Sequence, residues 1–198
     1  MKACDMTDNT PEAQFDNFFA LFEQPVQFDI IQDSLDQRLR LLQKHYHPDN
    51  VAKNVADNAK ATQQSEQASA LINQAYQTLS APDSRASYLL DMAGQAQNVE
   101  HSIADLDFLE DAMQMRIDLD DAIGDKDISA LQQLHPQITE RLAKQSARFN
   151  NAYQNQDWQA AIDATQKLKF LVKLNADITI GLDEVATTQH LDDDDLYV

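Results

Sequence analysis

Apolar residues recur at spacings of three and four along most of the chain, which is the period of an amphipathic helix. The clearest stripe consists of Leu35, Leu39, Leu42 and Tyr46. A second stripe follows after a polar stretch and consists of Ala68, Leu71, Ile72, Ala75, Tyr76 and Leu79. The pattern predicts two long helices, each with one buried face, that pack antiparallel with a polar turn between them.

Shorter apolar segments flank this pair. Four aromatic residues open the ordered part of the chain: Phe15, Phe18, Phe19 and Phe22. Pro25 is expected to end that first helix, and Asp29 is expected to cap the next one. The next helix ends before Pro48, because the residue preceding a proline is pushed out of the α region. A short helix over 84–93, ended by Gly94, closes the group.

In the second half of the chain, the apolar pattern predicts three further helices, over 105–123, 128–153 and 158–180. Their connections, at Gly124-Asp125 and at residues 155–157, are of the short kind that joins antiparallel neighbours in a helical bundle. Pro136 is expected to kink or split the middle helix, since it lacks a backbone N–H.

Composition agrees with an all-α class, because three glycines and five prolines leave few positions for tight β-turns. The segments predict an N-terminal arm (1–14), a helical domain (15–94), a linker (95–102), a three-helix bundle (103–182) and an acidic tail (183–198).

A net charge of -18 argues against general affinity for nucleic acid or an anionic membrane. Cys4 is the only cysteine, which excludes an internal disulfide. No signal peptide or membrane span is recognisable, so a cytoplasmic protein is expected.

The His47-Pro48-Asp49 turn is the strongest candidate for function, although it has an inert interpretation as a helix stop followed by an Asx turn. A metal pair of His45 and His47 is disfavoured, because no carboxylate or cysteine lies beside them at ligand spacing. The chain also has no nucleophile elbow and no Gly-rich phosphate loop. The sequence therefore predicts no catalytic residue, metal or cofactor, and leaves an enzyme centred on these histidines only as a remote alternative.

The helix before the turn is locally basic. Arg38, Arg40 and Lys44 are predicted on its exposed side, and no acidic residue occurs between Gln37 and Pro48 in a chain that is otherwise strongly acidic. A rigid turn that presents one carboxylate, flanked by cations, suits docking to another protein through charge-assisted hydrogen bonds.

This order of a short helix, a basic helix, a His-Pro-Asp turn and an antiparallel apolar helix resembles the J domain of DnaJ-type co-chaperones. The resemblance implies that His47, Pro48 and Asp49 contact a DnaK-class chaperone and accelerate its ATP hydrolysis, with Asp49 paired to a chaperone arginine. By the same resemblance, the flanking cations make electrostatic contacts: Arg38, Arg40 and Lys44. Asn50 stands where the family commonly has a lysine.

Five further segments are similar to the HscB family, the J-type co-chaperones of iron–sulfur cluster assembly: 17–22, 72–79, 85–90, 107–109 and 167–171. The similarity extends from about Phe15 to about Leu182. It implies an L-shaped protein in which the J domain is followed by a three-helix bundle. In that family the bundle binds the scaffold protein IscU and delivers it to the chaperone HscA.

The first helix of the bundle carries two apolar stripes. One consists of Phe108, Ala112, Met115, Leu119 and Ile123, and is expected to face the core. The other consists of Leu106, Leu109, Met113 and Ile117, bordered by Glu110 and Asp121. A helix in such a bundle needs one buried stripe, so the second is either covered by another element or open to a partner. Phe170 lies off the apolar line of its own helix and is a candidate extension of the second stripe.

The resemblance implies that five residues bind the scaffold: Leu109, Met113, Ile117, Asp121 and Phe170. Three positions depart from the family pattern, since Glu110 replaces an apolar residue while Gln114 and Ile117 replace acidic ones. A J-type co-chaperone whose bundle binds a different client therefore stays open as an alternative.

Overall fold

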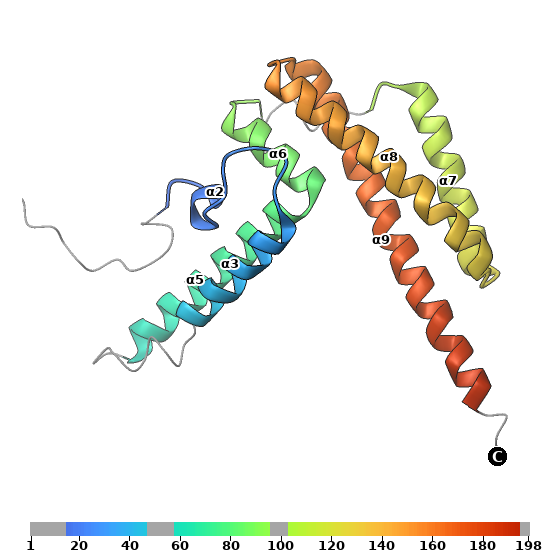
Figure 1. The fold of residues 1–198 in the computed structure, drawn as a ribbon, viewed down its shortest axis with the longest axis horizontal. Coiled ribbons are helices and arrows are strands. Elements are labelled where there is room, and N and C mark those ends of the chain that lie inside the picture. Colours follow the sequence, from blue (N-terminus) through green and yellow to red (C-terminus); the bar gives the residue numbers. More distant parts are fainter. Residues whose placement is uncertain (1–14, 47–57, 96–102, 195–198) are drawn as a thin grey trace, which may run out of the picture. The chain divides into compact units, whose positions relative to one another are not determined.

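The computed structural model describes residues 15–46, 58–95 and 103–194, and within these ranges the regular structure is entirely helical (Figure 1). The all-α prediction is confirmed. The helices are α2 (Phe18–Leu21), α3 (Gln32–His45), α5 (Asn58–Ser80), α6 (Pro82–Met92), α7 (Leu106–Gly124), α8 (Ile128–Gln154) and α9 (Trp158–Asp194). The chain divides into two compact units, Met1–Leu89 and Leu90–Val198.

In the N-terminal unit, α3 and α5 lie side by side and run antiparallel (Figure 1). Leu35 and Ile72 are fully buried between them. Polar contacts fix the register: the Tyr76 hydroxyl donates to Asp36 at 2.9 Å, and the Ser65 hydroxyl donates to the carbonyl of Tyr46 at 2.5 Å. The predicted pair of apolar stripes therefore forms the helical hairpin.

The aromatic cluster closes one end of this hairpin. Phe19 and Phe22 are fully buried, and the ring of Phe18 stacks on Tyr88 of α6 with centroids 4.8 Å apart. The Asn17 side chain caps α2 by accepting the backbone N–H of Ala20 at 2.8 Å. The short first helix is thus held by packing, since four residues are too few to be stable alone.

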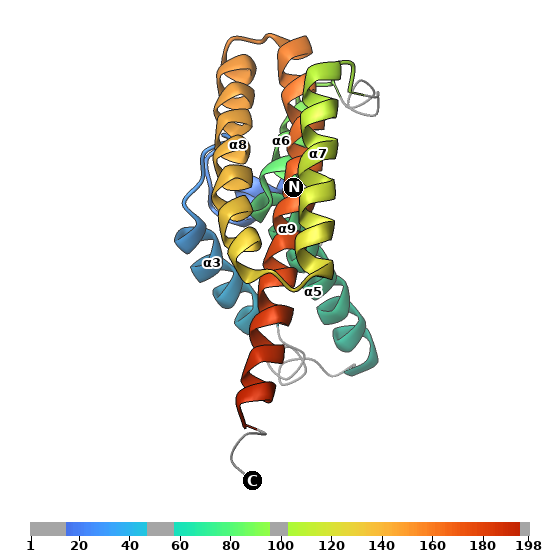
Figure 2. The ribbon, with the colours of Figure 1, turned by 90° about the vertical axis from the view of Figure 1, so that its right-hand side faces the viewer.

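In the C-terminal unit, α7, α8 and α9 pack along one another as a three-helix bundle (Figure 2). Each helix begins at an aspartate that accepts a backbone N–H of the first turn: Asp105, Asp127 and Asp157. The two connecting turns share one geometry, with Lys126 and Gln156 at positive φ in equivalent positions. The core of the bundle includes Leu119, Leu131, Ile138, Leu171 and Ile178.

Gly181 brings α9 close to the last turn of α7. A Cβ at this position would lie 2.9 Å from Cγ1 of Ile123, closer than side chains normally approach. The absence of a side chain therefore sets the spacing of the two helices here.

Three local expectations differ from the structure. α9 does not end near Ile180 but continues to Asp194, into the segment expected to be an acidic tail, because Val185 still joins the core. α8 is one helix that contains Pro136 and is not split there, since Leu131 and Ile138 on either side are buried in the same core. Asp29 does not cap α3, whose N-cap is Ile31 without a side-chain hydrogen bond.

Among the described residues, no helix combines the length and the apolar character needed to cross a membrane.

Candidate functional site

The His47-Pro48-Asp49 turn lies outside the described residues, but the structure shows how the chain enters it. α3 ends at His45, and the following Tyr46 is buried and donates its backbone N–H to the carbonyl of Leu42 at 2.9 Å. Burial raises the pKa of the Tyr46 phenol, so this residue is neutral. The backbone carbonyl of Tyr46 also accepts the Ser65 hydroxyl of α5, and the last described residue before the turn is therefore anchored to the hairpin.

The three cations of α3 are not equivalent. Arg38 was expected on the exposed side, but its side chain is only 21% exposed, pairs with Glu23 at 2.9 Å and donates to the carbonyl of Leu21 at 3.3 Å. It joins α3 to the loop after α2. Arg40 and Lys44 are exposed one turn apart.

Sequence reasoning missed an apolar residue on the same face of α3. Leu41 is 60% exposed beside Arg40 and Lys44. The signal was present in the sequence, because Leu41 falls outside the stripe of Leu35, Leu39, Leu42 and Tyr46. The cationic face of α3, made of Arg40, Leu41 and Lys44, therefore combines two charges with one apolar contact.

The second stripe of α7 is open. Leu106, Met113 and Ile117 are 76%, 63% and 50% exposed, whereas Ala112 and Leu119 on the opposite side are fully buried. Leu109 is half-buried, and Asp121 is exposed near the end of the helix. Within the C-terminal unit, the stripe is open.

α9 contributes an aromatic side chain beside α7. Phe170 is half-buried, packs on the core and places its ring edge-on to Phe108, with centroids 6.2 Å apart. Further along, Arg116 of α7 forms an ion pair with Asp177 of α9. The hydrogen bond to Asp177 raises the pKa of Arg116, which therefore stays charged.

Ile180, on α9, is 55% exposed and was not predicted. It follows Phe170, Lys173 and Asp177 at spacings of three, four and three, so a second periodicity in α9 was the available signal. We use the name α7–α9 apolar face for the set Leu106, Leu109, Met113, Ile117, Phe170 and Ile180. Exposed aliphatic and Met side chains with a charged border are typical of a surface that binds and releases a protein.

Comparison with known proteins relates both units to one family. A family model described as the HSCB C-terminal oligomerisation domain matches residues 104–179. A protein of Acinetobacter baumannii described as a co-chaperone protein HscB homolog is 36% identical over 181 residues, which cover 91% of this chain and 96% of the relative.

Solved structures agree with that relationship. The chaperone HscB from Vibrio cholerae is 34% identical in sequence, and its structure matches with a TM-score of 0.67. The match covers 85% of this chain and 99% of the Vibrio cholerae chain. Human co-chaperone protein HscB, at 23% identity, has the same fold with a TM-score of 0.67 and covers 86% of each chain.

Proposed function

Since the chain belongs to the HscB family of co-chaperones, we propose that it binds the iron–sulfur scaffold protein IscU, delivers it to the DnaK-class chaperone HscA and stimulates the ATPase of HscA. In this proposal the protein acts in the cytoplasm and breaks no bond itself. The α7–α9 apolar face holds the scaffold, while Asp49 and the cationic face of α3 engage the chaperone.

The observation that carries the proposal is the exposure of Met113 and Ile117 on a helix whose opposite side is fully buried. Burial of one such side chain contributes about 1.5–3 kcal/mol when it is complete. Two of them, together with the half-buried Leu109 and Phe170, supply enough apolar area for a specific but reversible contact. Glu110 and Asp121, both exposed, add charge near this face.

The proposed mechanism is proximity. A protein that holds client and chaperone at once converts their encounter into an intramolecular step, which raises the effective concentration of the client. Arg40 and Lys44 steer the acidic partner, and the carboxylate of Asp49 then pairs with an arginine of HscA. ATP hydrolysis takes place on HscA alone.

The decisive experiment measures HscA ATPase activity with and without IscU, in the presence of the wild type, Asp49→Ala and the neighbouring control Asn50→Ala. Asp49→Ala is expected to lose stimulation by about tenfold or more, because one charge-assisted pair contributes roughly 1.5–3 kcal/mol. Its affinity for IscU is expected to stay unchanged. Stimulation by Asp49→Ala equal to that of the Asn50→Ala control would remove the proposed role of the turn.

A second candidate is a J-type co-chaperone with a different client. It is favoured by the exposed Glu110 and Ile117, which alter the balance of charge along the α7–α9 apolar face. Calorimetric titration with IscU separates the two, since a different client predicts no measurable heat of binding.

A further inference from the structure

Met113 gives the α7–α9 apolar face its one sulfur atom. Its side chain is 63% exposed, and the residues one turn away on the same stripe, Leu109 and Ile117, are aliphatic. Met115, two positions further along α7, is only 5% exposed because it joins the core of the bundle. A reagent in solution therefore reaches the thioether of Met113 far more readily than that of Met115.

An exposed thioether reacts readily with peroxide. The sulfur attacks one oxygen of hydrogen peroxide, so that an S–O bond forms, the O–O bond breaks and water leaves. The sulfur is oxidised by two electrons, the peroxide is reduced, and the side chain becomes methionine sulfoxide. A flexible apolar side chain is thereby converted into a polar one with a strong hydrogen-bond acceptor. Methionine sulfoxide reductases reverse the change with a dithiol as reductant, releasing water and a disulfide.

The stripe offers the new oxygen little hydrogen bonding. Its neighbours four positions away on α7 are aliphatic, and the nearest cation on the helix is Arg116, three positions further on. Each of the three guanidinium nitrogens of Arg116 already faces a carboxylate, of Asp120 or of Asp177. Water can satisfy the sulfoxide on the free protein, but a client bound over the stripe would exclude that water. An acceptor buried without a donor opposes binding.

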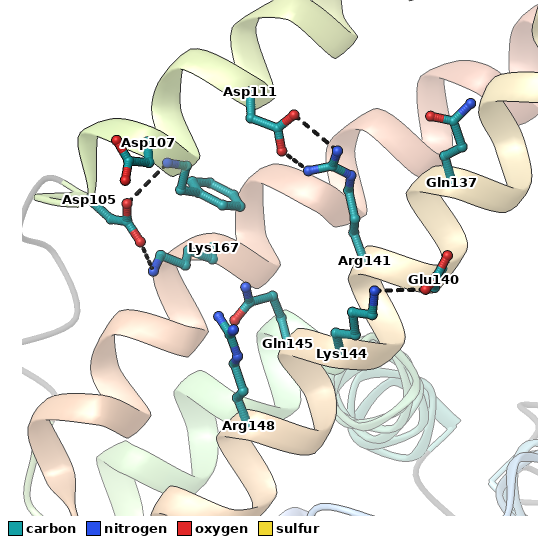
Figure 3. Close-up of a pocket in the computed structure, with 11 residues that line it drawn as sticks. Asp105, Asp107, Asp111, Gln137, Glu140, Arg141, Lys144, Gln145, Arg148 and Lys167 are labelled. Atoms are coloured by element: carbon teal, nitrogen blue, oxygen red, sulfur yellow. Dashed lines mark hydrogen bonds and ion pairs between the residues drawn. The ribbon is translucent and has the colours of Figure 1, made fainter.

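α7 is held in the bundle by contacts that do not involve Met113. Asp111 is two residues away from Met113, or about 200° around the helix. It pairs with Arg141 of α8, and Asp105 at the start of α7 pairs with Lys167 of α9 at 2.6 Å (Figure 3). Oxidation of Met113 therefore changes the exposed surface of α7 and leaves its packing intact.

We propose that Met113 is a redox-sensitive site, at which oxidation to the sulfoxide by hydrogen peroxide releases the client and reduction restores its binding. The inference rests on the proposed function, because the client is the scaffold held by the α7–α9 apolar face. It adds a control of that site by the state of one sulfur atom.

The test is calorimetric titration of the full chain with IscU before and after treatment with millimolar hydrogen peroxide, which catalase removes before the titration. Mass spectrometry is expected to show Met113 oxidised about tenfold faster than Met115, or more. The affinity for IscU is expected to fall about tenfold or more, with an unchanged melting temperature. It should recover after incubation with reductases for both sulfoxide epimers. Equal oxidation of the two methionines, or an unchanged affinity once Met113 is oxidised, would overturn the proposal.

Two variants identify the responsible sulfur, since Met92 is also 42% exposed and three further sulfur-containing residues lie outside the described ranges: Met1, Cys4 and Met6. Met92→Leu, a change in α6, is expected to bind IscU as the wild type does and to lose affinity on treatment to the same extent. In Met113→Leu, the affinities before and after treatment are expected to be equal, whatever the starting value. A loss of affinity in treated Met113→Leu assigns the effect to another sulfur and rejects the proposal.

The inference and the proposed function fail in different ways. If the untreated wild type gives no heat with IscU, scaffold binding is rejected, and the inference with it. If the treated and untreated wild type bind IscU equally, the inference alone is rejected and scaffold binding stands.

Discussion

α3 and α7 each bury one stripe and expose another, but the exposed stripes differ in chemistry. α3 presents Arg40 and Lys44 with the single apolar Leu41, whereas α7 presents Met113 and Ile117 with acidic residues at the edge. Both helices belong to a chain with a net charge of -18. The cations of α3 are therefore a local exception to the charge of the molecule, and the apolar stripe of α7 is a local exception to its polar surface.

This difference in chemistry shows how one small protein can bind two partners by different forces. Charges act over roughly 10 Å at moderate salt and mainly increase the rate and orientation of encounter. Apolar area acts only on contact and mainly determines how long a complex lasts. On this basis α3 is suited to repeated, brief encounters with a chaperone, and α7 to retention of a client.

Each helix is also anchored by an ion pair at its border. Arg38 ties α3 to Glu23 and to the carbonyl of Leu21. At the start of α7, Asp105 pairs with Lys167 of α9 at 2.6 Å. These charged residues hold the helices in place, and their loss is expected to change stability more than docking.

The largest expected effect comes from removal of the apolar stripe. Met113→Ala combined with Ile117→Ala is expected to weaken IscU binding by about 10- to 100-fold, because each 1.4 kcal/mol of lost contact is a tenfold change. Both side chains are at least half exposed, so the fold should be unaffected. Calorimetry measures the affinity, with Asp118→Ala on the polar side of α7 as the control. An unchanged affinity would exclude the stripe as the binding surface.

Salt concentration should affect binding through α3 more than binding through α7. Raising sodium chloride from about 0.05 to 0.5 M is expected to slow association with HscA by about tenfold, while IscU affinity changes by less than about twofold. Stopped-flow association and calorimetry on the same preparation give the two values. Equal salt sensitivity for both partners would show that the contrast between α3 and α7 does not govern binding.

The three cations of α3 should divide into one structural residue, Arg38, and two docking residues, Arg40 and Lys44. Arg38→Ala is expected to lower the stability of the N-terminal unit by about 1–2 kcal/mol, since its hydrogen bonds involve a charged donor and are only partly exposed. That loss corresponds to a fall in melting temperature of about 4–8 °C per kcal/mol. Arg40→Ala, an exposed change, should leave the melting temperature unaltered and reduce HscA stimulation. Calorimetric melting of both variants is the measurement, and equal melting temperatures would contradict the distinction.

The smallest effect concerns the anchor of α7. The hydrogen bond from Lys167, followed by that from the backbone N–H of Phe108, holds the pKa of Asp105 below its ordinary value of 3.8. A carboxyl group with a lowered pKa stabilises the folded state above its unfolded pKa, and this contribution is lost as the pH falls through the folded value. Asp105→Asn should therefore melt below the wild type at pH 7, and the difference should close in acid below about pH 3.8. A difference that is constant with pH would show that the charge of Asp105 is not its cause, since asparagine caps a helix about as well as aspartate.

Much of the secondary structure followed from local patterns in the sequence. The helices expected over 105–123 and 128–153 are observed as Leu106–Gly124 and Ile128–Gln154. These bounds were accessible because the 3.6-residue period and the capping aspartates act over a single turn. The exposed second stripe of α7 was visible for the same reason, since residues on one helix face have a regular spacing whatever surrounds them.

The remaining features depended on which neighbours the fold supplies. α9 extends to Asp194 because Val185 finds a core to join, and Arg38 is half-buried because the loop after α2 lies beside it. Gln145 reads in the sequence as an ordinary polar helix residue, but packing buries its amide oxygen away from any donor in the described residues. Helical periodicity determines which side chains share a face, whereas only tertiary packing decides whether that face meets a core, an ion-pair partner or an open groove.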